Sequence, residues 1–194
     1  FEESVHFATA SLWKNAYGFS ACQLDADALR NGTVALVHAR GIFEDGLSFD
    51  MPGCDALPES RNISGVFPPT ADHLTVSLSI PRWLQDGQNC DLQSAPGTNA
   101  RYTGVIEMMH DENTGRDEKP VRLGHKNIRL ILEFEPQEEV LTLPLARLMR
   151  DGSGHFVFDP TFVPPSVRLS ASEHLTGMLQ RLVEILEEKS AVVS

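Results

Sequence analysis

The sequence predicts a mainly β protein: a β-sandwich flanked by an N-terminal helix and a C-terminal amphipathic helix. Short apolar runs that alternate with period two recur between turn signals. Helical spacing is confined to the two ends, and no stretch alternates strands with helices. About seven to nine short strands of this kind are typical of a sandwich. We therefore expect a sandwich domain over 1–168 and a separate helical segment over 169–194.

The composition fits a folded, acidic protein. Of its 194 residues, 41% are hydrophobic and 22% charged, and the formal net charge is −11. The 16 Lys and Arg residues are scattered along the chain, so no nucleic-acid partner is expected. No apolar run approaches the roughly 20 residues that cross a bilayer, and no signal peptide is recognisable. We expect no membrane insertion, and we expect a fragment, because both ends fall inside predicted helices.

The first quarter of the chain contains one clear hairpin signal. In Glu44-Asp45-Gly46, the Asp-Gly pair supplies a residue that accepts positive φ, which is typical of a tight turn between antiparallel strands. Asn31-Gly32 is a second turn pair. The elements expected up to this hairpin are a helix over 1–16, an extended run over 19–24, a connector over 25–29 and a strand over 33–43.

The clearest strand covers residues 74–80, where four aliphatic residues alternate with Thr75, Ser77 and Ser79. The pattern predicts one apolar face toward the core and one hydroxyl face toward water. Pro81 ends this strand. The other expected elements are loops over 51–70 and 82–100, strands over 101–110 and 128–134, a charged turn over 111–120, an extended run from Leu141, a turn over 151–154 and a strand at 156–158.

No residue pattern indicates catalysis, a metal or a cofactor. The seven histidines stand singly, without the spacing that places two imidazoles on one metal. Ser153 lies between glycines but lacks the strand-turn-helix context of a nucleophile. Four glutamates around Pro136 are expected at a solvated strand end. The three cysteines Cys22, Cys54 and Cys90 lie far apart, which favours free thiols in a reducing compartment.

The run Phe158–Pro165 joins the last strand to the C-terminal helix. We name residues 159–165 the exit segment. Its three prolines remove amide donors, so it cannot pair as a central strand. It either folds back on its own sandwich or lies against a partner, and we leave both readings open. The candidate docking residues are Phe162, Val163, Pro164 and Pro165.

The C-terminal helix is predicted to begin at a capping box of Ser170 and Glu173, with Ser172 as a competing cap. An isolated helix of this length is marginal in water, so its apolar face needs a partner. We favour self-association of copies over packing on the sandwich, which stays the alternative. The candidate oligomer contacts are Leu175, Met178, Leu179, Leu182, Ile185 and Leu186.

Short motifs along nearly the whole chain resemble the TssK family of type VI secretion baseplate subunits, also called ImpJ or VasE. The most specific pieces are the strand Leu143-Pro144-Leu145-Ala146-Arg147 and the Asp-Pro-Thr-Phe-Val-Pro-Pro exit segment. The other matching pieces are Tyr17-Gly18, Leu24-Asp25, Gly32, 41–46, Ile80-Pro81, Arg101-Tyr102, Asn127-Ile128, 130–133, Leu169 and Ala171-Ser172.

The resemblance implies a non-enzymatic structural adaptor with no catalytic residue, metal or cofactor. In that family a shell domain, similar to the shoulder of phage receptor-binding proteins, attaches to the wedge subunits TssF and TssG. A helical neck gathers the full-length protein into a homotrimer, and a C-terminal head, absent from this sequence, reaches the membrane complex. The implied shell is 1–168, the start of the neck is 169–194, and the implied location is cytoplasmic, at the inner face of the inner membrane.

Two other functions compete with this interpretation. A phage-type receptor- or carbohydrate-binding sandwich would place its site in the loops 51–70 and 82–100, where Phe67 and Trp83 are the aromatic candidates. A hydrolase ranks last, because it requires a pocket of convergent titratable groups.

Overall fold

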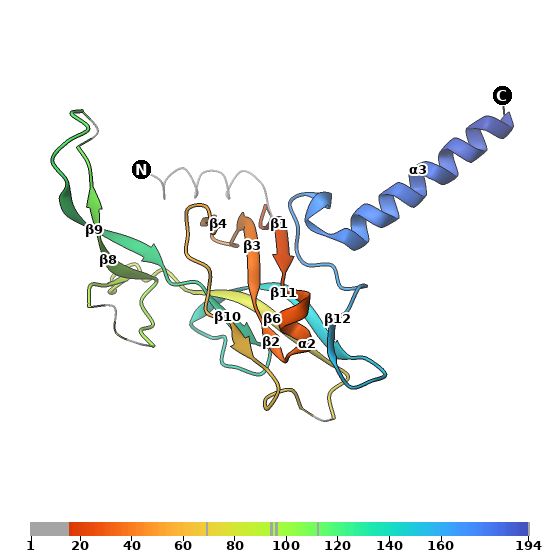
Figure 1. The fold of residues 1–194 in the computed structure, drawn as a ribbon, viewed down its shortest axis with the longest axis horizontal. Coiled ribbons are helices and arrows are strands. Elements are labelled where there is room, and N and C mark those ends of the chain that lie inside the picture. The colour runs from red at the N-terminus through yellow and green to blue at the C-terminus, as the bar shows by residue number, and fades with distance from the viewer. Residues whose placement is uncertain (1–15, 69, 94, 96, 112, 194) are drawn as a thin grey trace.

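The computed structural model describes residues 16–68, 70–93, 95, 97–111 and 113–193, and two β-sheets share one hydrophobic core (Figure 1). The predicted β-sandwich is confirmed, whereas residues 1–15 of the helix expected over 1–16 lie outside the described residues. One sheet has the order β1 (Gly18–Leu24), β3 (Leu36–Ile42), β4 (Ser48–Met51). The other has the order β10 (Arg129–Leu132), β6 (His73–Pro81), β11 (Val140–Arg150), β12 (Phe156–Phe158).

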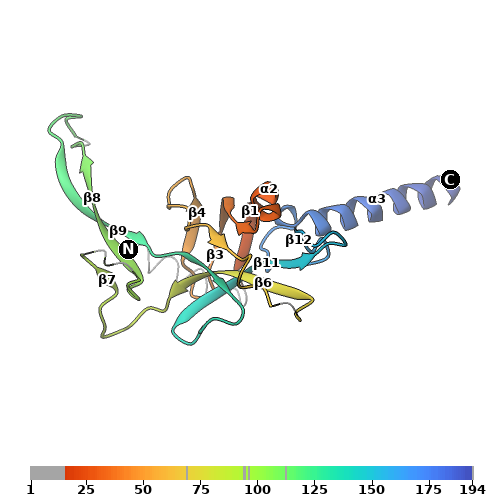
Figure 2. The same cartoon turned by 60° about the horizontal axis from the view of Figure 1, so that its bottom comes forward.

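Smaller elements surround the sandwich. Antiparallel β8 and β9 form a long ribbon that leaves it on one side, and helix α3 projects from the opposite side (Figures 1 and 2). The further strands are β2 (Thr33–Val34), β5 (Arg61–Asn62), β7 (Cys90–Asp91), β8 (Tyr102–Met109) and β9 (Lys119–Lys126). The helical elements are α2 (Ala26–Arg30), the 3-10 helix η1 (Leu169–Ala171) and α3 (Glu173–Val193).

Aliphatic and aromatic side chains from both sheets form the core. The antiparallel register places Leu78 of β6 opposite Leu143 of β11. From the facing sheet, the Phe49 ring lies 5.9 Å from Phe19 and 5.1 Å from Phe43, between ring centroids. Each such side chain contributes roughly 1.5–3 kcal/mol when fully buried. The period-two alternation of the sequence therefore becomes the inner faces of the sandwich.

Strand β11 contains a proline within its length. Pro144 pairs with Ser77 and Ala146 pairs with Val76, so Leu145 is an extra residue that forms a β-bulge. A bulge interrupts the hydrogen-bond ladder, and a proline, which has no amide hydrogen, is tolerated at such a point. Leu145 and Ala146 are both buried in the core.

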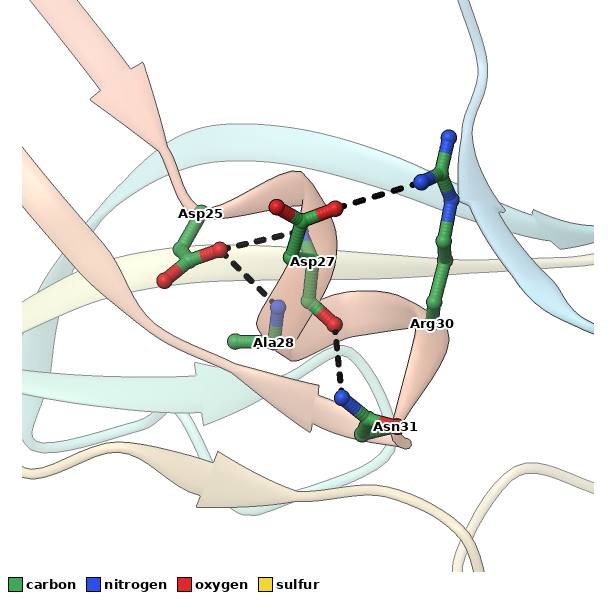
Figure 3. A network of polar contacts seen from close by, with 5 residues as sticks. All are labelled: Asp25, Asp27, Ala28, Arg30 and Asn31. Carbon is green, nitrogen blue, oxygen red and sulfur yellow. Dashed lines mark hydrogen bonds and ion pairs between the residues drawn. The ribbon is translucent and has the colours of Figure 1, made fainter.

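Residues 25–29, predicted as a connector, instead form the N-cap and most of helix α2 (Figure 3). The Asp25 carboxylate accepts hydrogen bonds from the amides of Asp27 and Ala28, each at 2.9 Å. This is an N-cap, which satisfies amides that the first turn leaves free. The Asn31 side chain donates to the Asp27 carbonyl at 3.0 Å and closes the other end. Because Leu29 is buried, core packing stabilises a helix too short for its periodicity to show.

The predicted loop 51–70 contributes to the core as well as to the surface. Ile63 and Phe67 are buried, and the Phe67 ring lies 5.5 Å from that of Phe156. β5 within this loop pairs with β2, and β2 and β3 divide the single strand expected over 33–43.

The hydroxyl face of β6 is covered rather than solvated. Ser77 and Ser79 are both buried, and the Ser79 hydroxyl donates to the carbonyl of Arg129 at 3.3 Å. The expected strand over 128–134 ends at Leu132, which leaves Phe134 half exposed. A further strand, β9, begins inside the segment predicted as a charged turn.

Candidate functional site

The exit segment folds back onto the edge of β1. The Phe19 amide donates to the Pro165 carbonyl at 2.8 Å, and the Val167 amide donates to the Phe19 carbonyl at 2.9 Å. Phe19 and Ser166 thus form a short parallel bridge. The sequence left open whether the exit segment folds back on its own sandwich or lies against a partner. Its backbone folds back on the sandwich.

Gly18 permits this close approach. Its φ is +132°, and a Cβ at this position would lie 2.6 Å from the carbonyl carbon of Pro165 and 2.7 Å from the amide nitrogen of Ser166. Those atoms belong to the backbone and cannot rotate away. Only glycine fits between β1 and the exit segment.

A polar junction fixes the start of the exit segment against β11. Arg147 Nε donates to Asp159 Oδ2 at 2.7 Å, while Asp159 Oδ1 accepts from the hydroxyl and amide of Thr161 at 2.7 and 2.8 Å. The hydrogen bond from the Thr161 hydroxyl, then that from its amide and the contact with Arg147, lower the pKa of Asp159. The Arg147 guanidinium also lies 5.5 Å from the centre of the Phe162 ring.

The four predicted docking residues differ in exposure. Pro164 is buried, Phe162 and Pro165 are partly buried, and Val163 is exposed. The sandwich therefore occupies most of their surface, and Val163 is the one whose side chain faces solvent. Docking of a partner on these residues stays a prediction.

Helix α3 directly follows a 3-10 turn. The cap is Ser172, whose hydroxyl oxygen accepts from the Leu175 amide at 3.4 Å, rather than the predicted Ser170. Ser170 lies within η1. Ala171 and Ser172 are buried, so the base of α3 is attached to the sandwich.

Beyond its base, α3 projects away from the sandwich and exposes its apolar side chains (Figure 1). Leu175 is partly buried, whereas the other five predicted contact residues are each 42–58% exposed. Val183, also exposed, was missed by the sequence analysis, although its spacing of four from Leu179 places it on the same side. The five exposed residues are Met178, Leu179, Leu182, Ile185 and Leu186.

The groups considered for catalysis make structural contacts. Ser153 lies in the turn between β11 and β12, where its amide donates to Asp151 at 2.8 Å. The carboxylate of Glu133 accepts from the Thr75 amide at 3.0 Å, and that of Glu135 accepts from the Leu132 amide at 2.8 Å. These two glutamates therefore hold the end of β10. Glu133 is exposed, as expected for a solvated strand end, whereas Glu135 is partly buried.

A groove of about 620 Å³ lies between β10 and the loops around 57–61 and 95–99. Three of its charged side chains are engaged: Arg61 pairs with Glu135, and Arg129 Nε donates to Asn127 Oδ1 at 2.9 Å. In the part of the chain that the structure describes, no three His, Cys, Asp or Glu side chains are grouped for a metal. Within the same ranges, no helix has the length and hydropathy of a membrane span.

Two further sequence candidates have different surroundings. Phe67 is buried and cannot serve as a sugar platform, whereas Trp83 is half exposed.

Burial raises the pKa of the Cys22 thiol to about 12, and Cys54 is exposed. The described cysteines are free thiols, as the sequence predicts.

Comparison with known proteins decides the family. A family model described as bacterial type VI secretion, VC_A0110, EvfL, ImpJ and VasE matches residues 1–194. The chain belongs to this VasE/ImpJ family. Type VI secretion system baseplate component TssK1 of Pseudomonas aeruginosa is 25% identical to it over 186 residues. That alignment covers 95% of this chain and 41% of the relative, so the chain spans about two fifths of the relative's length.

Solved structures confirm the VasE/ImpJ fold. A crystal structure of TssK matches with a TM-score of 0.84 at 23% identity, covering 98% of this chain and 43% of that one. A chain of the TssK-TssF-TssG baseplate subcomplex, determined by cryo-electron microscopy, matches with a TM-score of 0.84 at 24% identity, covering 96% and 62%. The resemblance to the TssK family noted in the sequence is confirmed.

The motifs that carried the VasE/ImpJ resemblance meet in space. Arg147 ends one specific motif and Asp159 begins the other, and their side chains are in direct contact. Gly18 and Pro165, from the first matching piece and the exit segment, form the close approach at β1. These residues together hold the joint between the sandwich and α3.

Proposed function

We propose that this chain is a structural, non-enzymatic adaptor of a type VI secretion baseplate, with a shell domain over 1–168 and the start of a neck over 169–194. The observation that carries the proposal is the match of all 194 residues to the VasE/ImpJ secretion family. The shell attaches to a wedge of TssF and TssG, as the name of the matched TssK-TssF-TssG subcomplex suggests. The baseplate is assembled in the cytoplasm at the inner face of the inner membrane.

The exposed apolar residues of α3, which we name the α3 seam, support the proposal that residues 169–194 are the start of a neck. Six apolar side chains that face solvent, Val183 included, are costly in water, and burying each contributes roughly 1.5–3 kcal/mol. Copies of the chain bury these residues against one another, and the longer protein forms a homotrimer through its complete neck. Contact with the membrane complex belongs to the part of the full-length relatives that this sequence does not span.

The joint gives the exit segment its role. The exit segment is held at both of its ends, by Arg147 at Asp159 and by Phe19, beside Gly18, at Pro165, so the shell and α3 keep a fixed mutual orientation. A baseplate subunit needs such rigidity because it transmits the position of one partner to another.

Co-elution tests the attachment to the wedge. The chain is mixed with purified TssF–TssG wedge at micromolar concentration and passed over a sizing column. We expect one complex peak, and separate peaks would contradict the proposal. Val163→Asp tests docking at the exit segment, with Val66→Asp as a control of similar exposure on a surface loop. Weaker co-elution of Val163→Asp alone is the result expected if the exit segment contacts the wedge.

A further inference from the structure

Strand β10 is an edge strand, and its outer side faces a groove. The sheet order β10-β6-β11-β12 gives β10 a single neighbouring strand, β6. The groove of about 620 Å³ lies between β10 and the loops around 57–61 and 95–99. An edge strand presents backbone amides and carbonyls, and an extended segment of a partner protein can add to them as a further strand.

The hydrogen bonds around β10 show which of its residues turn outward. The Glu133 amide donates to the Thr75 carbonyl at 3.1 Å, so the backbone of residue 133 faces β6. In an antiparallel pair, alternate residues exchange hydrogen bonds with the neighbouring strand, and the residues between them face the other way. Leu132 and Leu130 therefore direct their amides and carbonyls away from β6.

Leu132 and Leu130 differ in what meets them on that outer side. The Glu135 carboxylate accepts from the Leu132 amide at 2.8 Å, and the Glu135 amide donates to the Leu132 carbonyl at 2.9 Å. Among the residues that the structure describes, none provides the same pair of bonds to Leu130, which lines the groove and is only 3% exposed. Buried backbone groups need hydrogen-bond partners, so an incoming backbone would bind at Leu130.

The lining of the groove favours an uncharged segment. Its charged side chains belong to two arginines and two glutamates, so their formal charges cancel. Arg61 pairs with Glu135, Arg129 donates to neutral acceptors, and Glu59 is exposed. Such a groove selects its ligand by main-chain hydrogen bonds and apolar contact rather than by charge. The apolar lining residues include Leu57, Pro58, Pro81, Ile131, Pro136 and Val140.

The groove and helix α3 lie at opposite edges of one sheet. β12 forms the edge opposite β10, and the exit segment leads the chain from β12 to α3 (Figure 1). A subunit can therefore use its α3 seam and its β10 edge at the same time. The exit segment leaves only Val163 of its docking candidates exposed, so a partner that holds the shell needs a further contact surface.

We propose that the β10 edge binds one short, extended, apolar segment of the wedge, which adds as a strand and pairs its backbone with Leu130. Glu135 already occupies the position beside Leu132, so the added strand is short. The walls of the groove contact its side chains. The inference rests on the proposed function, in which the TssF–TssG wedge is the partner.

Hydrogen exchange tests the backbone pairing directly. The chain is mixed with purified TssF–TssG wedge, and exchange at the Leu130 amide is followed by mass spectrometry with fragmentation to single residues. We expect exchange at this amide to slow by about tenfold or more in the complex. Docking through side chains elsewhere on the shell would leave it unchanged.

Leu57→Asp tests the apolar wall of the groove, with Val66→Asp as a matched control. Leu57 lines the groove and is 41% exposed, whereas Val66 is 42% exposed in the same loop and lies outside the groove lining. We expect Leu57→Asp to weaken wedge binding by about tenfold or more, and the control to bind like the unmodified chain. Both variants should keep the melting temperature of the unmodified chain, because both side chains are exposed.

The outcomes separate this inference from the proposed function. Wedge binding with unchanged exchange at Leu130 would overturn the strand assignment, and so would equal binding by Leu57→Asp and the control. Protection of Leu130 that grows with the concentration of the chain alone would make a second copy the occupant and overturn the assignment to the wedge. Failure of the unmodified chain to bind the wedge would refute the proposed function itself, and this inference with it.

Discussion

Replacing Gly18 by alanine should destabilise the joint between the sandwich and the exit segment. The added Cβ would lie 2.6 Å from backbone atoms of Pro165, and the φ of +132° is one that an L side chain rarely adopts. Relief requires the exit segment to move away from β1. That movement breaks the two backbone hydrogen bonds that join Phe19 to Pro165 and Val167.

The magnitude follows from these two effects. A strained backbone costs about 1–3 kcal/mol, and each lost hydrogen bond costs about 0.5–1.5 kcal/mol. Because movement of the segment relieves part of the strain, we expect the free energy of unfolding to fall by about 3 kcal/mol. For a domain of this size, that corresponds to a melting temperature roughly 6–12 °C lower.

Thermal and urea unfolding of Gly18→Ala measure the loss, with Gly65→Ala as a matched control. A Cβ added at Gly65 would meet no atom within 4 Å, and Gly65 has no positive φ. Its replacement should therefore change stability by less than about 0.5 kcal/mol. A melting temperature for Gly18→Ala within about 2 °C of the unmodified chain would refute the account of the joint.

Three further predictions concern the neck, the exit segment and the thiols. Leu179→Glu with Leu182→Glu should convert any oligomer into monomer, and unchanged mass by light scattering would contradict self-association through α3. The lowered pKa of Asp159 contributes stability above the ordinary carboxyl pKa of 3.8, and this is lost as pH falls through the lowered value. Asp159→Asn should therefore be less stable than the unmodified chain at neutral pH, and urea midpoints should converge in acid. Because burial raises the pKa of Cys22 to about 12, iodoacetamide at mildly alkaline pH should label Cys54 and spare Cys22, as read by mass spectrometry.

Local chemistry was enough to predict most strands of the two main sheets, the hairpin at Gly46, the proline-rich exit segment and the C-terminal helix. Alternation with period two and helical spacing are properties of neighbouring residues, so they can be recognised without knowing what lies across the core. The Asp-Gly pair predicted its turn because glycine accepts positive φ, and Gly46 has a φ of 90°. The candidate seam of α3 followed from the same local spacing.

Tertiary contacts decided the rest. The alternation in β6 predicted that Ser77 and Ser79 face solvent, yet both are buried. Phe67, predicted in a surface loop, is buried in the core. The exit segment could have met a partner, and it pairs with β1 because Gly18, far earlier in the chain, leaves room for its backbone. Burial and close approach depend on residues far apart in the chain, and no local pattern records which of them will meet.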